Sequence, residues 1–594
     1  MMEFIAAHFV PSLFAGLLLF LLTGFPVAFS LAATGLFFGF LGMEAGLFPA
    51  TLFQALPLRI FGIMQNDTLL AIPFFTLMGI ILERSGMAED LLETVGQLFG
   101  PVRGGLALAV VFVGALLAAT TGVVAASVMA MGLISLPIML RYGYHPPIAT
   151  GVIVASGTLA QAVPPSLVLI VMADQLGRSV GDMYSGALLP AFLTVLLYAA
   201  FIIVIALVKP AWVPALPPDA RSLRESDGAS GHRSLLVLLT VCVAGAVMWG
   251  RFHGTILNPM LGREGDAPLD ERIVAALTVG ALLSILFASL DRLLKLGLLS
   301  QLAKRVVFVM IPPLVLIFLV LGTIFLGLAT PTEGGAMGAV GALIMAIARR
   351  RLTFALLKEA LEATARLSTF VLFILIGATV FSFTFNAADG HYFVEGLFKD
   401  IPGGTLGFML IVNLLVFVLG MFIDFFEIAF IVVPLLAPVA EKMGIDLIWF
   451  GVILAFNLQT SFLTPPFGFA LFYLRSIAAK TDYLDVVTGK RIAAVTTPEI
   501  YRGATAFIIL QLIVVTAIIA FPQLVTGGLE KKQAVDLETI QIEVAPSDYD
   551  QPTDGATDQG GHGASPPAGE DRQKQEEDPT AQLLEEMARE KKKQ

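Results

Sequence analysis

The chain has 594 residues, of which 57% are hydrophobic and 14% charged, and its formal net charge is −10. With a mean hydropathy of +0.86, this composition excludes an ordinary soluble domain and indicates a polytopic membrane protein. The single cysteine, Cys242, excludes a disulfide framework and a cysteine metal site. Most of the acidic excess lies in 527–594, which holds 16 acidic and 8 basic residues, so we expect a disordered tail there.

Twelve apolar runs are long enough to cross a bilayer as single helices. The first has neither a basic start nor a small-residue cleavage site, so we expect a retained helix rather than a signal peptide. Two further apolar blocks, 104–140 and 406–440, are interrupted near the middle, and each fits either two short spans or a re-entrant hairpin. The twelve runs are 5–25, 27–43, 66–82, 147–173, 185–208, 234–250, 271–290, 306–328, 330–348, 367–385, 446–475 and 503–522.

The run at 147–173 is broken at its midpoint by the stretch SGTLAQAVPPS. The pair Pro164-Pro165 removes backbone donors and cannot continue a helix. A kink in a packed helix would explain one such pair. A second pair, Pro465-Pro466, interrupts the run at 446–475 in the same way, which favours two breaks that serve a binding site.

Proline and glycine positions recur along the chain at an offset of 301 residues. The same offset pairs the two interrupted blocks, so we interpret the chain as an internal duplication. We expect repeats at 1–208 and 306–526, with two extra spans inserted at 209–305 and the tail at 527–594. The matched positions are Pro137 with Pro438, Gly143 with Gly444, Pro164 with Pro465 and Pro165 with Pro466.

Loop charges predict opposite orientations for the two repeats. Arg103 and Arg141 flank the first interrupted block, whereas Asp400 and Glu441 flank the second. By the positive-inside rule, the first block opens to the cytoplasm and the second to the outside, which gives five spans per repeat and both termini outside. Inverted repeats with helices broken at mid-membrane are the architecture of secondary transporters. Their freed carbonyls and half-helix ends hold a cation and an anionic substrate.

Two arm-like segments, 46–64 and 349–366, are amphipathic and are expected to lie at the membrane interface. Such helices can hold a scaffold steady while another part of a protein moves. The inserted spans contain no polar break, so we expect them to extend that scaffold.

Five motifs in order along the chain are AIPFFTLMG (71–79), GTLAQAVPPS (157–166), ATPTEGG (329–335), GMFID (420–424) and LTPPFG (463–468). Together they resemble the large membrane subunit of TRAP (tripartite ATP-independent periplasmic) transporters, the DctM-like family. The resemblance covers about 1–208 and 306–522.

The resemblance implies an all-α polytopic membrane protein with about 12 spans, two re-entrant hairpins and two broken helices, as in elevator-type members of the ion-transporter superfamily. It implies sodium-driven import of organic acids across the bacterial inner membrane, with sodium as the coupling ion and no organic cofactor. The implied partners are a small four-helix DctQ-like membrane subunit and a periplasmic DctP-like substrate-binding protein. A one-component sodium-coupled carboxylate carrier of similar inverted-repeat fold is the alternative.

In the family, each hairpin tip faces a broken helix, and each such pair holds one sodium ion, with many contacts from backbone carbonyls. The first sodium site is implied at Thr120, Thr121, Gly122, Ala160, Val163 and Pro165. The second is implied at Gly420, Asp424, Ser461, Thr464 and Phe467. The substrate is expected at Ser156, Gly157, Thr158, Gln161, Asn457 and Thr460.

Three carboxylates stand in apolar surroundings, where acids are costly and usually functional. Asp424 either holds a cation or braces the second hairpin tip by accepting hydrogen bonds from backbone N–H groups. We favour the brace, because Asp424 and Glu427 together would repel an anionic substrate. Glu333 is expected to cap the start of its helix, where the positive end of the helix dipole favours an acid.

Other classes of function lack their residues in this sequence. An intramembrane enzyme would need an acid, base or nucleophile cluster, but His145, His253 and His391 fall in expected loops and Cys242 is isolated. A channel would keep a continuous polar file, which two matched proline breaks do not suggest. No basic nucleic-acid motif is present, so we expect no enzyme and no nucleic-acid partner.

Overall fold

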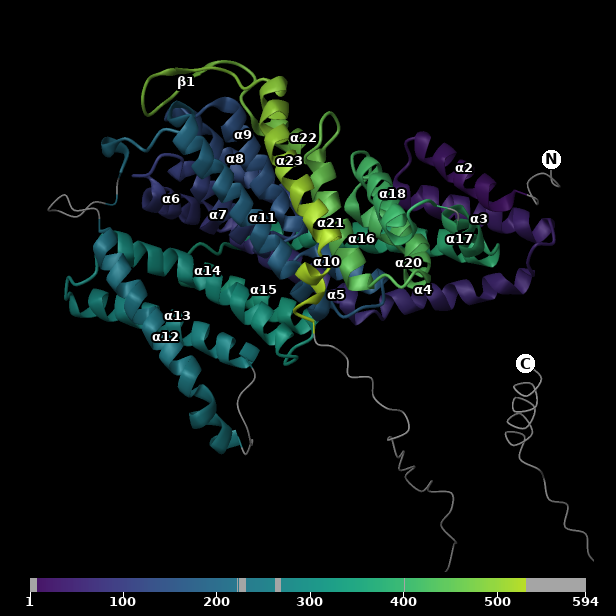
Figure 1. The fold of residues 1–594 in the computed structure, drawn as a ribbon, viewed down its shortest axis with the longest axis horizontal. Helices are drawn as coiled ribbons and strands as arrows, with labels where there is room; N and C mark the ends of the chain where they lie inside the picture. Colours follow the sequence, from purple (N-terminus) through teal and green to yellow (C-terminus); the bar gives the residue numbers. More distant parts are fainter. Residues whose placement is uncertain (1–7, 222, 224–230, 262–268, 400, 530–594) are drawn as a thin grey trace, which may run out of the picture. The chain divides into compact units, whose positions relative to one another are not determined.

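The computed structural model describes residues 8–221, 223, 231–261, 269–399 and 401–529, which fold mainly into helices (Figure 1). Strand structure among these residues is one short antiparallel pair, β1 (Tyr483–Leu484) with β2 (Arg491–Ile492). The chain divides into two units, Met1–Glu530 and Lys531–Gln594. The expected acidic tail therefore lies, from residue 530 on, outside the described residues.

The first repeat begins with two apolar helices, a bent arm and two further helices. The arm is separate from the next helix: the side chain of Asn66 accepts a hydrogen bond from Thr68 N and caps a new helix, which is bent by 44° from the arm. The elements are α2 (Phe9–Leu22), α3 (Val27–Glu44), η1 (Ala50–Ala55), α4 (Leu56–Met64), α5 (Asp67–Arg84) and α6 (Met87–Phe99).

The rest of the first repeat contains the first interrupted block and the first broken run. The block forms two helices joined at Gly122, and the run forms two helices separated by residues 159–166. The elements are α7 (Gly105–Thr121), α8 (Val124–Arg141), α9 (Pro146–Thr158), η2 (Leu159–Gln161), α10 (Leu167–Gln175) and α11 (Val180–Val208).

The inserted region forms two long helices, α12 (His232–Leu261) and α13 (Leu269–Leu294), after two short turns, η3 (Pro210–Trp212) and η4 (Pro218–Ala220). The two helices pack on each other and on the first helix of the second repeat, α14 (Gln301–Phe325), as Figure 1 shows. Both helices are long and apolar enough to cross a membrane.

The second repeat follows the same order as the first, with one difference in its arm. The elements after α14 are α15 (Pro331–Ala348), α16 (Phe354–Ala387), α17 (Gly390–Lys399), α18 (Gly404–Leu419), α19 (Phe425–Glu427), the π-helical turn η5 (Ile428–Val432), α20 (Val433–Lys442), α21 (Leu447–Phe462), α22 (Phe469–Ile477), α23 (Thr497–Ala520) and α24 (Gln523–Thr526).

The second arm-like segment, 349–366, does not form a helix of its own. Residues 354–366 belong to α16, which continues without a break to Ala387 over 34 residues. The reason lies in local propensity: this stretch is rich in Leu, Ala, Glu and Lys, which favour helix, and it has no capping residue corresponding to Asn66.

Within the described residues, nine helices are long and apolar enough to cross a membrane, or up to 11 when bent pairs are counted as single spans. This is below the twelve expected from hydropathy. The difference has a physical reason: both broken runs divide into pieces shorter than a membrane span, and α2 has only 14 residues. The chain is nevertheless a multi-pass, mainly helical membrane protein.

Helix contacts recur with the two repeats exchanged. At the offset of 301, α3 corresponds to α15 and α5 to α16, and the structure packs α3 on α16 and α5 on α15. Similarly, α8 packs on α22 while α20 packs on α10, and α9 packs on α23 while α21 packs on α11. The two repeats therefore interlock rather than standing apart as separate domains. The broken helices lie at the centre, since every residue of α21 and all of α9 from Ile148 are buried.

Candidate functional site

Both proline pairs lie in true breaks between helices. Residues 162–166 separate η2 from α10, and residues 463–468 separate α21 from α22. Pro164-Pro165 and Pro465-Pro466 are each joined by a cis peptide bond. A kink within one continuous helix is thus excluded at both positions, and the predicted breaks are confirmed.

Ser166 holds the first break in shape. Its hydroxyl donates to the carbonyl of Gln161 at 2.7 Å and accepts from the backbone N–H of Val168 at 3.2 Å, which caps α10. The hydroxyl of Tyr184 on α11 lies 3.5 Å from the carbonyl of Ser166. Side-chain hydroxyls therefore form hydrogen bonds with backbone groups on both sides of the proline pair.

The second break has a comparable set of internal bonds. The Thr464 hydroxyl donates to the carbonyl of Thr460 at 2.8 Å, and Gly468 N donates to the carbonyl of Thr464 at 2.9 Å. From α23, the Tyr501 hydroxyl donates to the carbonyl of Pro466 at 3.1 Å. Phe467, also placed in the second sodium site from sequence, lies in this break and packs on Phe422 of the hairpin turn, with ring centroids 4.8 Å apart.

The first hairpin packs against the first break. Gly122 at its tip has φ +59°, a conformation that favours glycine, and a Cβ there would lie 2.9 Å from Leu167 at the start of α10. On α9, Gly157 packs so closely on Val128 of α8 that a Cβ would overlap the valine side chain. Thr120 and Thr121 end α7 beside this tip, but their side chains lie outside the described part of the structure.

The second hairpin tip packs against the end of α21. A Cβ on Gly420 would overlap the hydroxyl oxygen of Ser461, so only glycine allows this approach. The Ser461 hydroxyl donates to the carbonyl of Leu458 at 2.8 Å. The structure thus brings together Gly122 with the first break and Gly420 with the second, which is the juxtaposition expected for two ion sites.

Several buried polar side chains at the breaks have no hydrogen-bond partner among the described residues. They are Ser156 Oγ and both amide atoms of Gln161 at the first break, and both amide atoms of Gln459 on α21. A buried polar group without a partner costs about 1–3 kcal/mol, so an ion, a water molecule or a substrate group at these positions would stabilise them. Gln459 is not among the residues expected from the sequence, although the offset of 301 pairs it with Thr158.

The other expected substrate residues bond to protein groups. The hydroxyls of Thr158 and Thr460 donate to carbonyls of their own helices, at 2.9 and 3.0 Å. The side-chain amide of Asn457 donates to the carbonyl of Asn413 at 2.6 Å, which links α21 to the hairpin helix α18. Ala160 and Val163, placed in the first sodium site from sequence, lie in η2 and in the loop after it.

Asp424 braces the second hairpin tip. Its Oδ1 accepts from Phe425 N at 2.7 Å, and Glu427 Oε2 accepts from Asp424 N at 3.1 Å, so the two acids form a capping box at the start of α19. The favoured interpretation of Asp424 as a brace is confirmed, and a sodium contact from it stays a prediction. Glu333 also forms the expected cap, in a capping box with Thr330.

Two salt bridges show that the broken helices run antiparallel. Arg141 at the end of the first hairpin pairs with Asp485, which follows α22, at 2.8 Å. Glu441 at the end of the second hairpin pairs with Arg178, which follows α10, at 3.0 Å. Each broken helix starts just after its own hairpin and ends beside the other hairpin, so the two cross the protein in opposite directions.

Comparison with known proteins assigns the family. The family model "Tripartite ATP-independent periplasmic transporter, DctM component" matches residues 14–261 and 268–524. The chain is 27% identical over 432 residues to the C4-dicarboxylate TRAP transporter large permease protein DctM of Pseudomonas aeruginosa, covering 73% of this chain and 82% of the relative. It is 25% identical to the sialic acid TRAP transporter large permease protein SiaM of Vibrio cholerae, covering 85% and 94%.

Among solved structures, the chain is similar to the Alcanivorax borkumensis YdaH transporter, with a TM-score of 0.47, 13% identity and coverage of 79% of this chain and 88% of that chain. The family match spans both repeats, both hairpins and both breaks. The chain therefore belongs to the DctM component family of tripartite ATP-independent periplasmic transporters.

Proposed function

We propose that this protein is the large permease subunit of a sodium-driven secondary transporter that imports organic acids. One observation carries the proposal: two antiparallel broken helices each meet a hairpin tip beside buried polar side chains without partners. Half-helix ends and freed carbonyls at such breaks are suited to a cation and to an anionic substrate.

The proposal includes two sodium sites. The first would lie at the tip Thr120–Gly122 and the break at Ala160, Val163 and Pro165, and the second at Gly420, Ser461, Thr464 and Phe467, with Asp424 holding the tip in place. Between the two breaks, Ser156, Gly157, Thr158, Gln161, Asn457 and Thr460 would bind the substrate.

An elevator mechanism fits the packing. The helices α3, α5, α15 and α16 pack on one another and would form the stationary scaffold. The hairpins and broken helices pack on one another and on α11 and α23, and would move together with ion and substrate. The proposal also includes an inverted repeat, in which the two hairpins are re-entrant and open to opposite faces of the membrane.

The proposed assembly lies in the bacterial inner membrane with a small membrane subunit and a periplasmic substrate-binding protein. A one-component carrier is the second candidate, and copurification of the chain with a small membrane protein would decide between them.

Uptake into proteoliposomes tests the energy source. With the chain, its small subunit and its binding protein present, an inward sodium gradient should drive accumulation of substrate without nucleotide. Full accumulation with sodium absent from both sides would overturn the proposal.

A further inference from the structure

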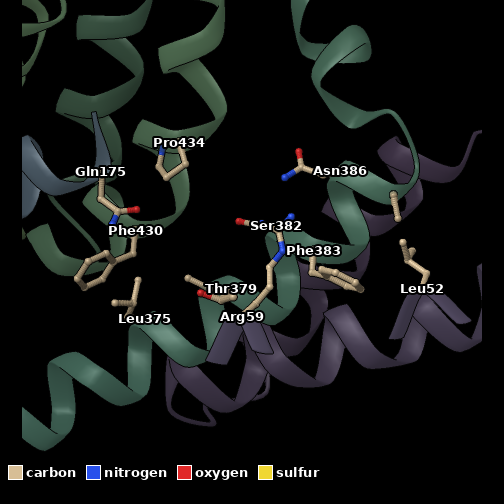
Figure 2. A pocket seen from close by; sticks show the side chains of 12 residues that line it. Leu52, Arg59, Gln175, Leu375, Thr379, Ser382, Phe383, Asn386, Phe430 and Pro434 are labelled. Carbon is tan, nitrogen blue, oxygen red and sulfur yellow. The ribbon is translucent and has the colours of Figure 1, made fainter. Parts of the chain in front are cut away.

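A cavity lies away from the two proline breaks, where the arm helix α4 meets α16 and the end of α10. Its volume is about 360 Å³, and Figure 2 shows Arg59, Thr379, Ser382 and Asn386 around it, with Gln175 and Phe430 on the other side. An adjoining cavity of about 620 Å³ shares Arg59, Gln175, Leu375 and Thr379. We call the first of these the Arg59 cavity.

Arg59 lines the cavity as an exposed cation that forms no salt bridge with a described residue. Its guanidinium carbon lies 5.8 Å from the centroid of the Phe383 ring, a cation–π distance that restricts where the side chain points. No salt bridge to Arg59 is formed by the residues that the structure describes. In contrast, Arg349 and Arg351 both pair with Asp90.

One face of α16 supplies neutral polar groups next to this cation. Thr379, Ser382 and Asn386 follow at spacings of three and four residues, which places them on one side of the helix. All three line the Arg59 cavity. A guanidinium with neutral hydroxyl and amide donors beside it is an arrangement that recognises a carboxylate.

Apolar side chains complete the lining: Leu375 lies one turn before Thr379 on the same face of α16, and Phe430 and Pro434 lie across the cavity. The adjoining cavity contains a carboxylate, Asp174, which accepts hydrogen bonds from the side-chain amides of Asn66 at 2.7 Å and Gln175 at 2.8 Å. Arg59 is the only cation among the described residues that line the two cavities, so a second negative charge on a ligand would meet no second cation there and would be repelled by Asp174.

We infer that the Arg59 cavity binds a singly charged organic acid, with its carboxylate on Arg59 and its apolar part against Phe430 and Leu375. The inference rests on the proposed function for the class of substrate, and it selects monocarboxylates over dicarboxylates. The site combines groups of the proposed scaffold, on α4 and α16, with Gln175 and Phe430 of the proposed moving part. The organic acid would bind in this cavity first, separately from the proposed ion sites.

Cysteine reactivity tests the charge of the cavity without any transport. Ser382→Cys is made in the full-length Cys242→Ala chain, which is placed in phosphatidylcholine nanodiscs. The rate of modification is measured with a methanethiosulfonate that carries a sulfonate and with uncharged methyl methanethiosulfonate. Arg59→Gln should lower the ratio of the two rates by roughly threefold or more, because a nearby cation concentrates the anionic reagent.

Two variants serve as controls for that ratio. Arg59→Lys should largely preserve it. Arg366→Gln should leave it unchanged, because Arg366 lies on the same helix, about 24 Å from Ser382 at 1.5 Å per residue. A ratio that Arg59→Gln does not change, or a cysteine that the uncharged reagent cannot reach, would overturn the inference.

Protection from the uncharged reagent tests the ligand class. Hexanoate should slow modification when Arg59 is present and lose this effect in Arg59→Gln, and succinate should protect less than hexanoate. Equal or better protection by succinate would overturn the choice of monocarboxylates. If phosphatidylglycerol in the nanodiscs blocks labelling by the anionic reagent and removes protection by hexanoate, the cavity holds a lipid headgroup and the inference fails.

The labelling experiments require neither sodium nor the partner subunits. Loss of the proposed sodium-driven uptake with intact, Arg59-dependent protection would therefore count against the proposed function alone. Normal sodium-driven uptake with no effect of Arg59→Gln on labelling would count against this inference alone.

Discussion

Arg141 and Asp485 form a salt bridge at 2.8 Å although 344 residues separate them in the chain. Arg141 ends α8 of the first hairpin, and Asp485 lies between α22 and β2 in the second repeat. The Asp485 carboxylate also accepts from the Thr488 hydroxyl at 2.6 Å and from Thr488 N at 2.8 Å. The contact fixes the end of one repeat's hairpin to the end of the other repeat's broken helix.

The stability of this contact should depend on pH. The hydrogen bonds from Thr488 and the charge of Arg141 hold the pKa of Asp485 below its ordinary value. A carboxylate with a lowered folded-state pKa stabilises the fold above its unfolded pKa of about 4, and the contribution is lost as the pH falls further. Asp485→Asn should lower the Tm by roughly 2–5 °C at pH 7, and the difference from the unaltered protein should shrink toward pH 3.

The exposed acid Asp219 provides the matched control. Asp219→Asn should leave the Tm unchanged at every pH. An Asp485→Asn difference that stays constant from pH 7 to pH 3 would show that the carboxylate charge does not contribute.

Restoring a continuous helix at the first break should weaken the proposed first sodium site. Pro164→Ala with Pro165→Ala returns two N–H donors, so carbonyls in the break gain helical partners instead of facing an ion. The sodium concentration for half-maximal uptake should rise by roughly tenfold or more, a loss of about 1.4 kcal/mol. Membrane level is measured in parallel, and normal sodium affinity in a well-expressed variant would contradict the site.

The close approach of Gly420 to Ser461 gives a second, independent test. Gly420→Ala would push the hairpin tip away from α21, and overpacking of this kind costs about 1–3 kcal/mol. We expect the sodium requirement of uptake to rise by roughly five- to hundredfold. Gly396→Ala is the matched control in the same repeat, because a Cβ there meets nothing within 4 Å.

Labelling from the two sides of the membrane tests whether the hairpins are re-entrant. Cysteines at Arg103 and Tyr142, in the Cys242→Ala background, should both react with an impermeant reagent from the cytoplasmic side. Cysteines at Lys399 and Glu441 should both react from the outside. If the two ends of either block react from opposite sides, that block crosses the membrane and is not a hairpin.

Local sequence rules predicted the features that depend on local chemistry. Pro164 and Pro465 broke their helices because proline lacks an N–H group wherever it stands. Glu333 and Asp424 capped helices because a capping box needs only neighbours three residues apart. The offset of 301 paired helices of the two repeats, and the structure adds that each packs on the counterpart of its neighbour.

The same rules did not predict features that depend on distant parts of the chain. The amphipathic helix α6 was overlooked, and its Asp90 finds Arg349 and Arg351 only after folding. Gln459 has no local sign that its amide is left without a partner, and the amphipathic pattern of 46–64 does not show that Arg59 lines a cavity. Such positions are defined by what packs opposite them, which a single sequence does not state.

The two salt bridges at the hairpin ends differ in their contact with solvent. Arg141 and Asp485 are 20% and 4% exposed, whereas Arg178 and Glu441 are 37% and 65% exposed. Mobile ions screen an exposed pair much more than a buried one, with a Debye length of about 8 Å at physiological ionic strength. Rising ionic strength should therefore weaken the Arg178–Glu441 pair more than the Arg141–Asp485 pair. The two salt bridges occupy matched positions in the two repeats, yet only one of them responds strongly to salt.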